Sequence, residues 1–245
     1  MLSTNDLKTY TFPEDMTSKE RLEFLRSLDL SFVYRDFSWS LEDRSEDSPE
    51  DSLEEDNTVK IFSLEIFFEQ EGLGTYAAKS QIPLPASFEN SEVSKQLNRR
   101  QGSSKTLKEA LTRSEDFTTA DQIDYLVFLL GMAELPSYWK AYASLNVKIE
   151  AGPLTPDEER WWLHLYWNGL GEYLYLNDLP LTPETLMTLG TWQTNDKIFN
   201  HIKLQRPTET DSILIPIGGG KDSIVTLERL ADEGEKRHAF CINPN

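Results

Sequence analysis

A short segment near the end of the 245-residue chain restricts the fold more than any other part of the sequence. An apolar run, 213–217, ends in three consecutive glycines, 218–220. The next stretch, 221–231, has apolar residues at helical spacing, and a second apolar run covers 238–242. The order strand, glycine loop, helix, strand over about 30 residues predicts one βαβ unit. We therefore expect 208–245 to begin an α/β domain with a parallel sheet.

The loop between the first strand and the helix has the chemistry of an anion site. Gly218, Gly219 and Gly220 leave backbone N–H groups accessible and let a phosphate approach without a Cβ clash. The helix directs the positive end of its dipole to the same place, while Lys221 adds a full charge and Ser223 a hydroxyl donor. These five residues are predicted to bind the phosphates of a nucleotide.

Asp222 would repel a phosphate, so we expect it to cap the helix or to face Mg²⁺ or water. Two better-known loops fit poorly. The Walker A pattern would need Gly at Ile215 and Ser or Thr at Asp222, and the dinucleotide fingerprint would need Gly at Ser223. A glycine turn without a ligand is the alternative, although three glycines cost chain entropy unless a close backbone approach requires them.

The segment Gly218-Gly219-Gly220-Lys221-Asp222-Ser223 resembles the PP-loop of the ATP pyrophosphatase superfamily, usually Ser-Gly-Gly-x-Asp-Ser. Gly218 replaces the usual Ser, so that side-chain contact with phosphate is missing. The wider segment from Pro216, with Gly171-Glu172-Tyr173 upstream and a long aromatic-rich N-terminal region, resembles the MurL family. That family epimerises the terminal L-glutamate of UDP-N-acetylmuramoyl-L-alanyl-L-glutamate, a peptidoglycan precursor.

The resemblance implies a Rossmann-like, HUP-type domain and an isomerase that uses ATP and Mg²⁺. ATP and the UDP-linked muropeptide precursor would be its partners, and the product would be the D-glutamate form with AMP and pyrophosphate. An acyl-adenylate would remove the carboxylate charge, which makes the α-proton easier to abstract. By the same resemblance, Asn243 contacts the adenosine. The base that abstracts the proton is not indicated, so the catalytic residues are unknown.

Two other functions fit the sequence. One is a different PP-loop enzyme, of the amide-forming or tRNA-modifying type; the net charge of −18 and the absence of a cysteine pair argue against tRNA. The other is a non-catalytic interaction domain with a degenerate loop. Because only two parallel strands fit into 208–245, we also expect a truncated nucleotide domain that does not turn over ATP alone.

Residues 1–205 are predicted to form a separate α+β domain. The stretch 58–68 is rich in β-branched and aromatic residues and predicts a strand. The polar stretch 90–113 is expected to be a flexible surface connection, although its basic residues could instead contact phosphates. Helices are expected over 121–132, over 136–143, over 159–167 after a cap at Thr155, and from a cap at Thr182 to about 189.

The helix at 159–167 carries several aromatic residues. We expect Trp161, Leu165 and their neighbours to fill the core, with stacking against a base or sugar as the alternative. His164, His201 and His238 are isolated from other metal-binding residue types, so no metal site is expected.

Charge is concentrated in 42–57, which holds nine acidic residues and one Arg. With so little apolar surface to bury, this segment is expected to be a mobile acidic loop, and binding of a basic partner is the alternative. The overall charge of −18 argues against broad nucleic-acid binding, because phosphates are bound by basic surfaces. The single cysteine, Cys241, and the lack of a long apolar run favour a cytoplasmic protein without a membrane span.

Overall fold

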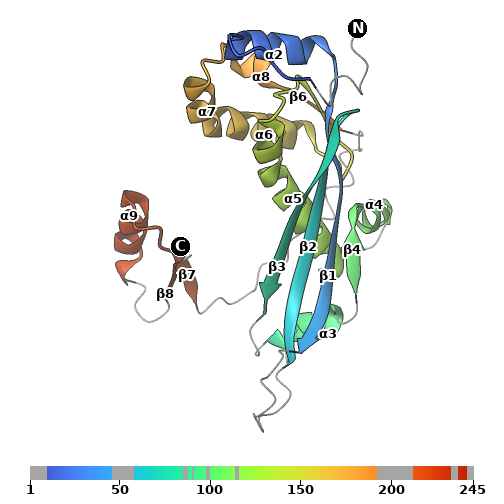
Figure 1. Cartoon of the computed structure of the whole chain (residues 1–245). Coiled ribbons are helices and arrows are strands. Elements are labelled where there is room, and N and C mark those ends of the chain that lie inside the picture. The colour runs from blue at the N-terminus through green and yellow to red at the C-terminus, as the bar shows by residue number, and fades with distance from the viewer. Residues whose placement is uncertain are drawn as a thin grey trace, which may run out of the picture. The chain divides into compact units, whose positions relative to one another are not determined.

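The computed structural model describes residues 10–45, 58–84, 88–89, 91–97, 100–113, 116–191, 212–232 and 237–241. It divides into two compact units, Met1–Lys203 and Leu204–Asn245, each of which is described by itself. Figure 1 labels most of the elements of both units. None of the described helices is both long and apolar enough to cross a bilayer.

Unit 1 is built on a mixed sheet of six strands with the order β3-β2-β1-β5-β6, to which β4 adds by pairing with β1. Strands β1, β2, β3 and β4 pair in antiparallel fashion, whereas β5 is parallel to β1 and β6 is parallel to β5. This confirms the predicted α+β class of the N-terminal domain. The elements are α2 (Ser18–Ser27), β1 (Phe32–Ser45), β2 (Thr58–Gln70), β3 (Gly74–Pro83), α3 (Glu92–Leu97), β4 (Gln101–Ser103), α4 (Ser104–Thr112), α5 (Thr119–Trp139), β5 (Asn146–Ile149), α6 (Pro156–Gly169), α7 (Gly171–Leu176), α8 (Pro183–Leu186) and β6 (Thr188–Thr191).

Strand β1 is the centre of this sheet, and one extra residue changes its side-chain alternation. Tyr34 pairs with Phe68 and Asp36 with Phe67, so Arg35 has no partner on β2 and forms a bulge. Even-numbered residues face the core before the bulge, and odd-numbered residues face it afterwards. The four largest side chains of β1 on that face, Phe32, Tyr34, Phe37 and Trp39, are therefore all buried.

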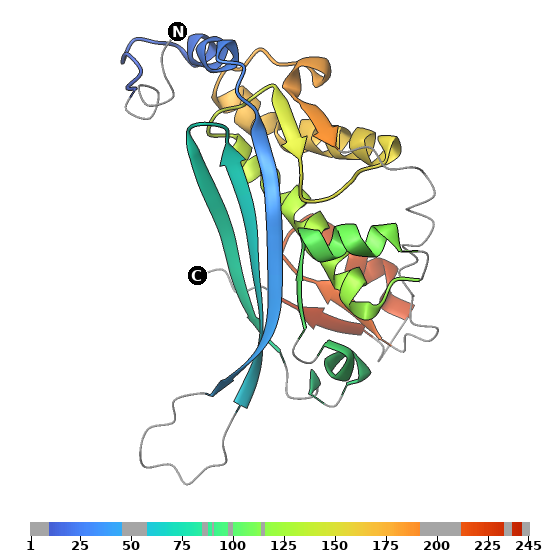
Figure 2. The ribbon, with the colours of Figure 1, turned by 90° about the vertical axis from the view of Figure 1, so that its right-hand side faces the viewer.

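Helix α5 supplies the other half of this core and runs along the sheet, as Figure 1 shows. The rings of Tyr34 and Phe128 stack with centroids 5.8 Å apart, and the Tyr34 hydroxyl lies 3.4 Å from the Phe128 carbonyl oxygen. Tyr34 approaches α5 closely at Gly131. A Cβ added to Gly131 would lie 2.0 Å from the Tyr34 hydroxyl oxygen, so a larger residue does not fit there. The long twisted strands β1, β2 and β3 are seen from another side in Figure 2.

The helices predicted over 121–132 and 136–143 are one continuous helix, α5, with Pro136 inside it. Proline has no N–H, so the carbonyl of Met132, four residues earlier, loses its helical donor. The Tyr166 hydroxyl of α6 donates to that carbonyl oxygen at 2.6 Å. A tertiary hydrogen bond thus satisfies the acceptor, and burial raises the pKa of Tyr166 well above its ordinary value.

The polar stretch 90–113 is not a simple surface connection. Its described part contains α3, β4 and α4, and Leu97, Leu107 and Leu111 are buried in the core. Leucines at helical spacing within a polar sequence anchor these short elements to the sheet, so the prediction of a flexible connection was wrong.

The acidic segment begins later than predicted. Residues 42–45 are the end of β1 and pair with β2, where Lys60 Nζ lies 2.5 Å from Asp43 Oδ1. The lysine on the neighbouring strand compensates the negative charge of Asp43. Composition alone could not show this pairing, so it predicted a loop here. Residues 46–57 lie outside the described residues.

Helix α6 starts at the predicted cap, where Thr155 and Glu158 form a reciprocal capping box. Its buried face carries Trp162 and Tyr166, whereas Trp161 is 55% exposed and Leu165 43% exposed. The prediction that Trp161 and Leu165 fill the core was therefore wrong. The capping box at Thr182 opens only a single turn, α8, because the chain then pairs as β6 with β5.

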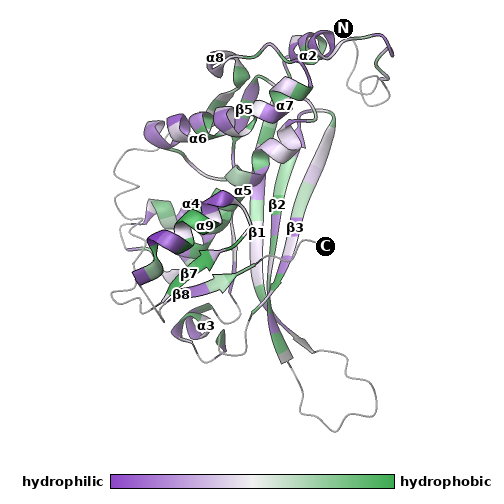
Figure 3. Cartoon of the chain, turned by 90° about the vertical axis from the view of Figure 1, so that its left-hand side faces the viewer, coloured by the Kyte–Doolittle hydropathy of each residue, from purple (hydrophilic) through white to green (hydrophobic). Residues whose placement is uncertain are grey.

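Unit 2 contains β7 (Ile213–Pro216), α9 (Lys221–Arg229) and β8 (Arg237–Phe240). β7 and β8 pair in parallel, from Ile213 opposite Arg237 to Pro216 opposite Phe240. The elements thus follow the predicted order strand, loop, helix, parallel strand. Figure 3 shows that β7 is hydrophobic and that α9 mixes hydrophilic and hydrophobic residues. Ile224 and Val225 of α9 are exposed.

Replacing Gly131 by Ala is expected to lower the free energy of unfolding of unit 1 by about 1–3 kcal/mol, because the new methyl group displaces the buried Tyr34 ring. The matched control is Gly169→Ala in α6, where a Cβ meets nothing within 4 Å. Denaturant unfolding followed by tryptophan fluorescence measures both, since all six tryptophans lie within residues 39–192. Equal stability of the two variants would contradict the close approach.

Candidate functional site

The predicted phosphate loop connects β7 to α9. Ile215 anchors β7 as its buried residue, and the Ile217 N–H donates to the Phe240 carbonyl oxygen at 2.8 Å, which extends the pairing with β8 by one bond. The chain then leaves the sheet through Gly218 and Gly219. Gly219 has a φ of +78°, in the left-handed region that glycine adopts without strain. Local backbone geometry therefore requires glycine at position 219.

Ser223 determines the shape of this loop. Its Oγ accepts a hydrogen bond from the Gly218 N–H at 3.0 Å, which closes a loop between residues five positions apart. A serine hydroxyl that accepts one bond still has its own proton to donate. Ser223 therefore holds the glycines in place and can also act as the donor predicted from the sequence.

Helix α9 begins directly after the glycines. Gly220 is the N-cap residue, and its carbonyl oxygen accepts from Ser223 N at 3.1 Å and Ile224 N at 3.4 Å. The N–H groups of Lys221 and Asp222 precede the first bonds within the helix and point outward from its N-terminus. Backbone donors, the helix dipole and the Lys221 charge thus act at one place.

Packing within the protein does not explain why positions 218 and 220 are glycine. A Cβ on Gly218 or Gly220 would meet no heavy atom within 4 Å among the described residues. Lys221 and Asp222 are both exposed beside this open space. An approaching anion would use this space, and it could reach the backbone N–H groups without meeting a side chain.

Asp222 does not cap α9, because the N-cap is Gly220 and makes no side-chain capping bond. This leaves the Mg²⁺ or water role of Asp222 as the remaining prediction. Magnesium ions in phosphate sites are held by one or two carboxylates together with phosphate oxygens, so a single exposed carboxylate fits. Among the described residues, no group of three or more His, Cys, Asp or Glu side chains is placed to hold a metal ion. Asn243 lies outside the described residues.

Sequence reasoning did not single out Asp124, a buried carboxyl group of α5 in unit 1. It accepts a hydrogen bond from the Trp39 indole Nε1 at 2.6 Å. Burial raises its pKa to about 6, and hydrogen bonds from Thr106 and Trp39 oppose part of that shift. The available signal was an acidic residue within the apolar stretch from Ile123 to Leu130.

Comparison with known proteins places these features in a family. The sequence model described as the MurL N-terminal domain matches residues 105–245, which is more than half of the chain. This chain belongs to the MurL N-terminal domain family. The match contains the whole predicted phosphate loop and α5. No solved structure matches the chain.

Two curated relatives of the MurL family are named UDP-N-acetyl-alpha-D-muramoyl-L-alanyl-L-glutamate epimerase. The protein from Salinispora tropica is 33% identical over 109 residues, which are 44% of this chain and 22% of the relative. The protein from a Micromonospora species is 37% identical over 121 residues, which are 48% of this chain and 25% of the relative. The similarity therefore spans about a quarter of each relative.

Lys221→Ala is expected to weaken the binding of pyrophosphate by about 1.5–3 kcal/mol, the range for hydrogen bonds to charged groups. Arg229→Ala is the matched control, because it removes the same charge from the other end of α9. Titration calorimetry measures both affinities. Unchanged binding by the Lys221 variant, or equal losses in both variants, would contradict a phosphate site at the loop.

Asp124 is expected to make the stability of unit 1 depend on pH. Its pKa of about 6 lies above the ordinary 3.8, so its stabilising contribution is complete below pH 4 and is lost as the pH rises through 6. Asp124→Asn keeps an acceptor for Trp39 and cannot ionise. Its free energy of unfolding relative to the wild type should rise by about 2–3 kcal/mol between pH 4 and pH 7. Urea titrations at several pH values measure this difference, and a flat difference would refute the shifted pKa.

Proposed function

We propose that this chain provides the N-terminal region and the ATP-phosphate loop of an ATP-dependent epimerase. The substrate is the terminal L-glutamate of UDP-N-acetylmuramoyl-L-alanyl-L-glutamate, and the products are the D-glutamate form, AMP and pyrophosphate. In this proposal unit 2 begins a Rossmann-like domain of the PP-loop ATP pyrophosphatase superfamily. The reaction supplies a peptidoglycan precursor.

The observation that carries the proposal is the geometry of the loop at 218–223. A left-handed Gly219, an open approach over Gly218 and Gly220, and the start of α9 together form a surface of N–H donors. Lys221 adds a positive charge at the same end of the helix. Membership of the MurL family and the names of the two relatives support the identity of the substrate.

The chemistry of the substrate explains the need for ATP. An ionised carboxylate makes the neighbouring α-proton very weakly acidic, and an acyl-adenylate removes that charge. A base can then take the proton from one face and return it to the other, after which water releases AMP. Gly218, Gly219, Gly220, Lys221 and Ser223 would orient the phosphates, and Asn243 would contact the adenosine. Asp222 would hold Mg²⁺, which supplies charge neutralisation for the departing pyrophosphate.

The test is made on the complete protein that carries this chain. With ATP, Mg²⁺ and the UDP-linked dipeptide in D₂O, deuterium is expected to enter the α-position of the terminal glutamate, and AMP to form. Mass spectrometry and chiral analysis of the released glutamate measure the two outcomes.

Lys221→Ala is expected to lower the rate by at least about tenfold, in line with a lost bond to a charged group. Arg229→Ala should keep the rate near that of the wild type. AMP formation without deuterium exchange would contradict the epimerase proposal and would indicate another ATP-cleaving activity. If neither reaction occurs while pyrophosphate still binds, the loop is a phosphate site without this function.

A further inference from the structure

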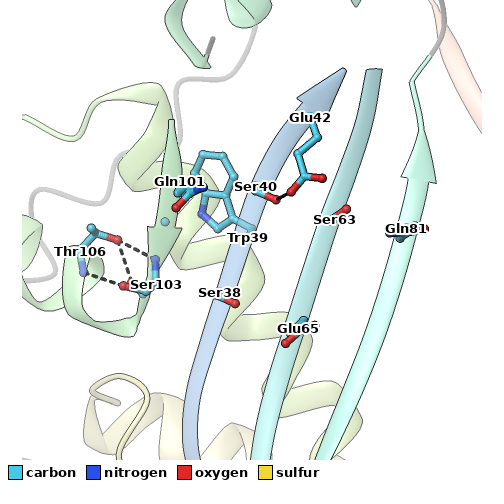
Figure 4. Close-up of a pocket in the computed structure, with 11 residues that line it drawn as sticks. Ser38, Trp39, Ser40, Glu42, Ser63, Glu65, Gln81, Gln101, Ser103 and Thr106 are labelled. Atoms are coloured by element: carbon cyan, nitrogen blue, oxygen red, sulfur yellow. Dashed lines mark hydrogen bonds between the residues drawn. The ribbon is translucent and has the colours of Figure 1, made fainter. Parts of the chain in front are cut away.

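Two rows of polar side chains cross four strands on the face of the unit 1 sheet opposite the core. In one row, Gln101 of β4 pairs with Ser40 of β1, and Ser63 of β2 pairs with both Ser40 and Gln81 of β3. In the neighbouring row, Ser38 of β1 pairs with Ser103 of β4 and Glu65 of β2. Directly opposed residues of antiparallel strands share a face, so these side chains lie together, as Figure 4 shows.

This face is hollowed into a groove with a cavity volume of about 620 Å³, within the range of small-ligand sites. Its lining residues are Ser38, Trp39, Ser40, Glu42, Ser63, Glu65, Gln81, Gln101, Gly102, Ser103 and Thr106. Hydroxyl and amide groups dominate this lining. We call it the serine–glutamine groove.

Ser63 distinguishes the groove from an ordinary solvated sheet face. Its Oγ is buried and has no hydrogen-bond partner within the described part of the chain. A buried hydroxyl without a partner is costly, and rotation of the Ser63 side chain about χ1 toward the groove would let a ligand there provide the missing hydrogen bond.

One side of the groove is held rigidly. Ser103 and Thr106 form a reciprocal capping box at the start of α4, with the Ser103 N–H donating to Thr106 Oγ1 at 2.8 Å. The Trp39 indole is bonded to buried Asp124, and a Cβ added to Gly102 would lie 2.0 Å from the Trp39 Nε1. The groove therefore keeps its shape without a ligand, which reduces the entropy cost of binding.

The charges of the lining limit the ligand. Glu42 and Glu65 are its only charged residues among those described, so an anion is repelled. Glu65 Oε1 lies 2.6 Å from Lys79 Nζ, which balances its charge. Glu42 accepts from the Ser40 hydroxyl at 2.6 Å and is exposed, and a single exposed carboxylate contributes little to the binding of a cation. The many donors and acceptors disfavour an apolar molecule.

We propose that the serine–glutamine groove binds an uncharged sugar ring. Hydroxyl and amide side chains both donate and accept, as sugar hydroxyls do, and four strands present them at regular spacing. The proposal does not depend on the phosphate loop or on the reaction assigned to the complete protein.

The test uses the ¹⁵N-labelled 245-residue chain and the neutral sugar N-acetylglucosamine. The reporter is the side-chain NH₂ signal of Gln81, an exposed residue of the lining, which is identified by its loss in Gln81→Ala. Addition of the sugar is expected to shift this signal until it saturates. Glucuronate, an anion of similar size, should bind more weakly because of Glu42, and glucosamine, a cation, should bind no more tightly than the neutral sugar.

Ser63→Ala and Gln101→Ala are each expected to weaken binding about two- to tenfold, the usual effect of one hydrogen bond. The matched control is Ser80→Ala, because Ser80 is exposed on β3 next to Gln81 but pairs with Leu64 of the core face. The melting temperature of each variant shows that the fold is kept.

Absence of a saturable shift with N-acetylglucosamine overturns the proposal. Binding of glucosamine alone also overturns it, since that result describes a cation site. If Ser63→Ala and Gln101→Ala both fold and bind as tightly as Ser80→Ala, the sugar binds elsewhere and the groove is refuted.

Discussion

The bulge at Arg35 is the constraint on which unit 1 depends. It inserts one residue into the central strand, and the side chains on either side of it keep one shared core face. Two ion pairs hold it: Arg35 Nε lies 2.6 Å from Glu69 Oε2, and one terminal nitrogen lies 2.6 Å from Glu150 Oε2. After the bulge, Trp39 reaches Asp124 while Ser38 and Ser40 turn to the opposite face. The aromatic core and the polar groove are thus two results of the same insertion.

The same bulge explains why the sequence did not reveal the central strand. Every residue from Phe32 to Tyr34 is buried, and after the bulge the core-facing positions change from even to odd numbers, so no continuous alternation is present. The acidic end of β1 further resembled a loop, because pairing of Asp43 with Lys60 needs a partner that is distant in the chain. Strand β2 and the cap at Thr155 were predicted, since their signals are local.

The loop at 218–223 was predicted from the sequence and the serine–glutamine groove was not, for the same reason. Residues 218–223 are contiguous, and a glycine run between an apolar strand and an amphipathic helix predicts their arrangement directly. The groove combines β1, β2, β3 and β4, and the bond between Trp39 and Asp124 joins residues 85 positions apart. Pro136 shows the same limit, because the Tyr166 hydroxyl that lets α5 continue through it comes from another helix.

The extent of the family match has a consequence for how the domain can be divided. The match begins at residue 105, yet β1, β2, β3 and β4 all lie before that position. A piece of the protein that started there would keep α5 and β5 but lose the strands that cover Phe128 and Met132, both of which are fully buried. The recognisable family segment therefore covers only the second part of unit 1, together with unit 2. Expression boundaries drawn from sequence similarity would cut through the middle of a hydrophobic core and yield an insoluble product.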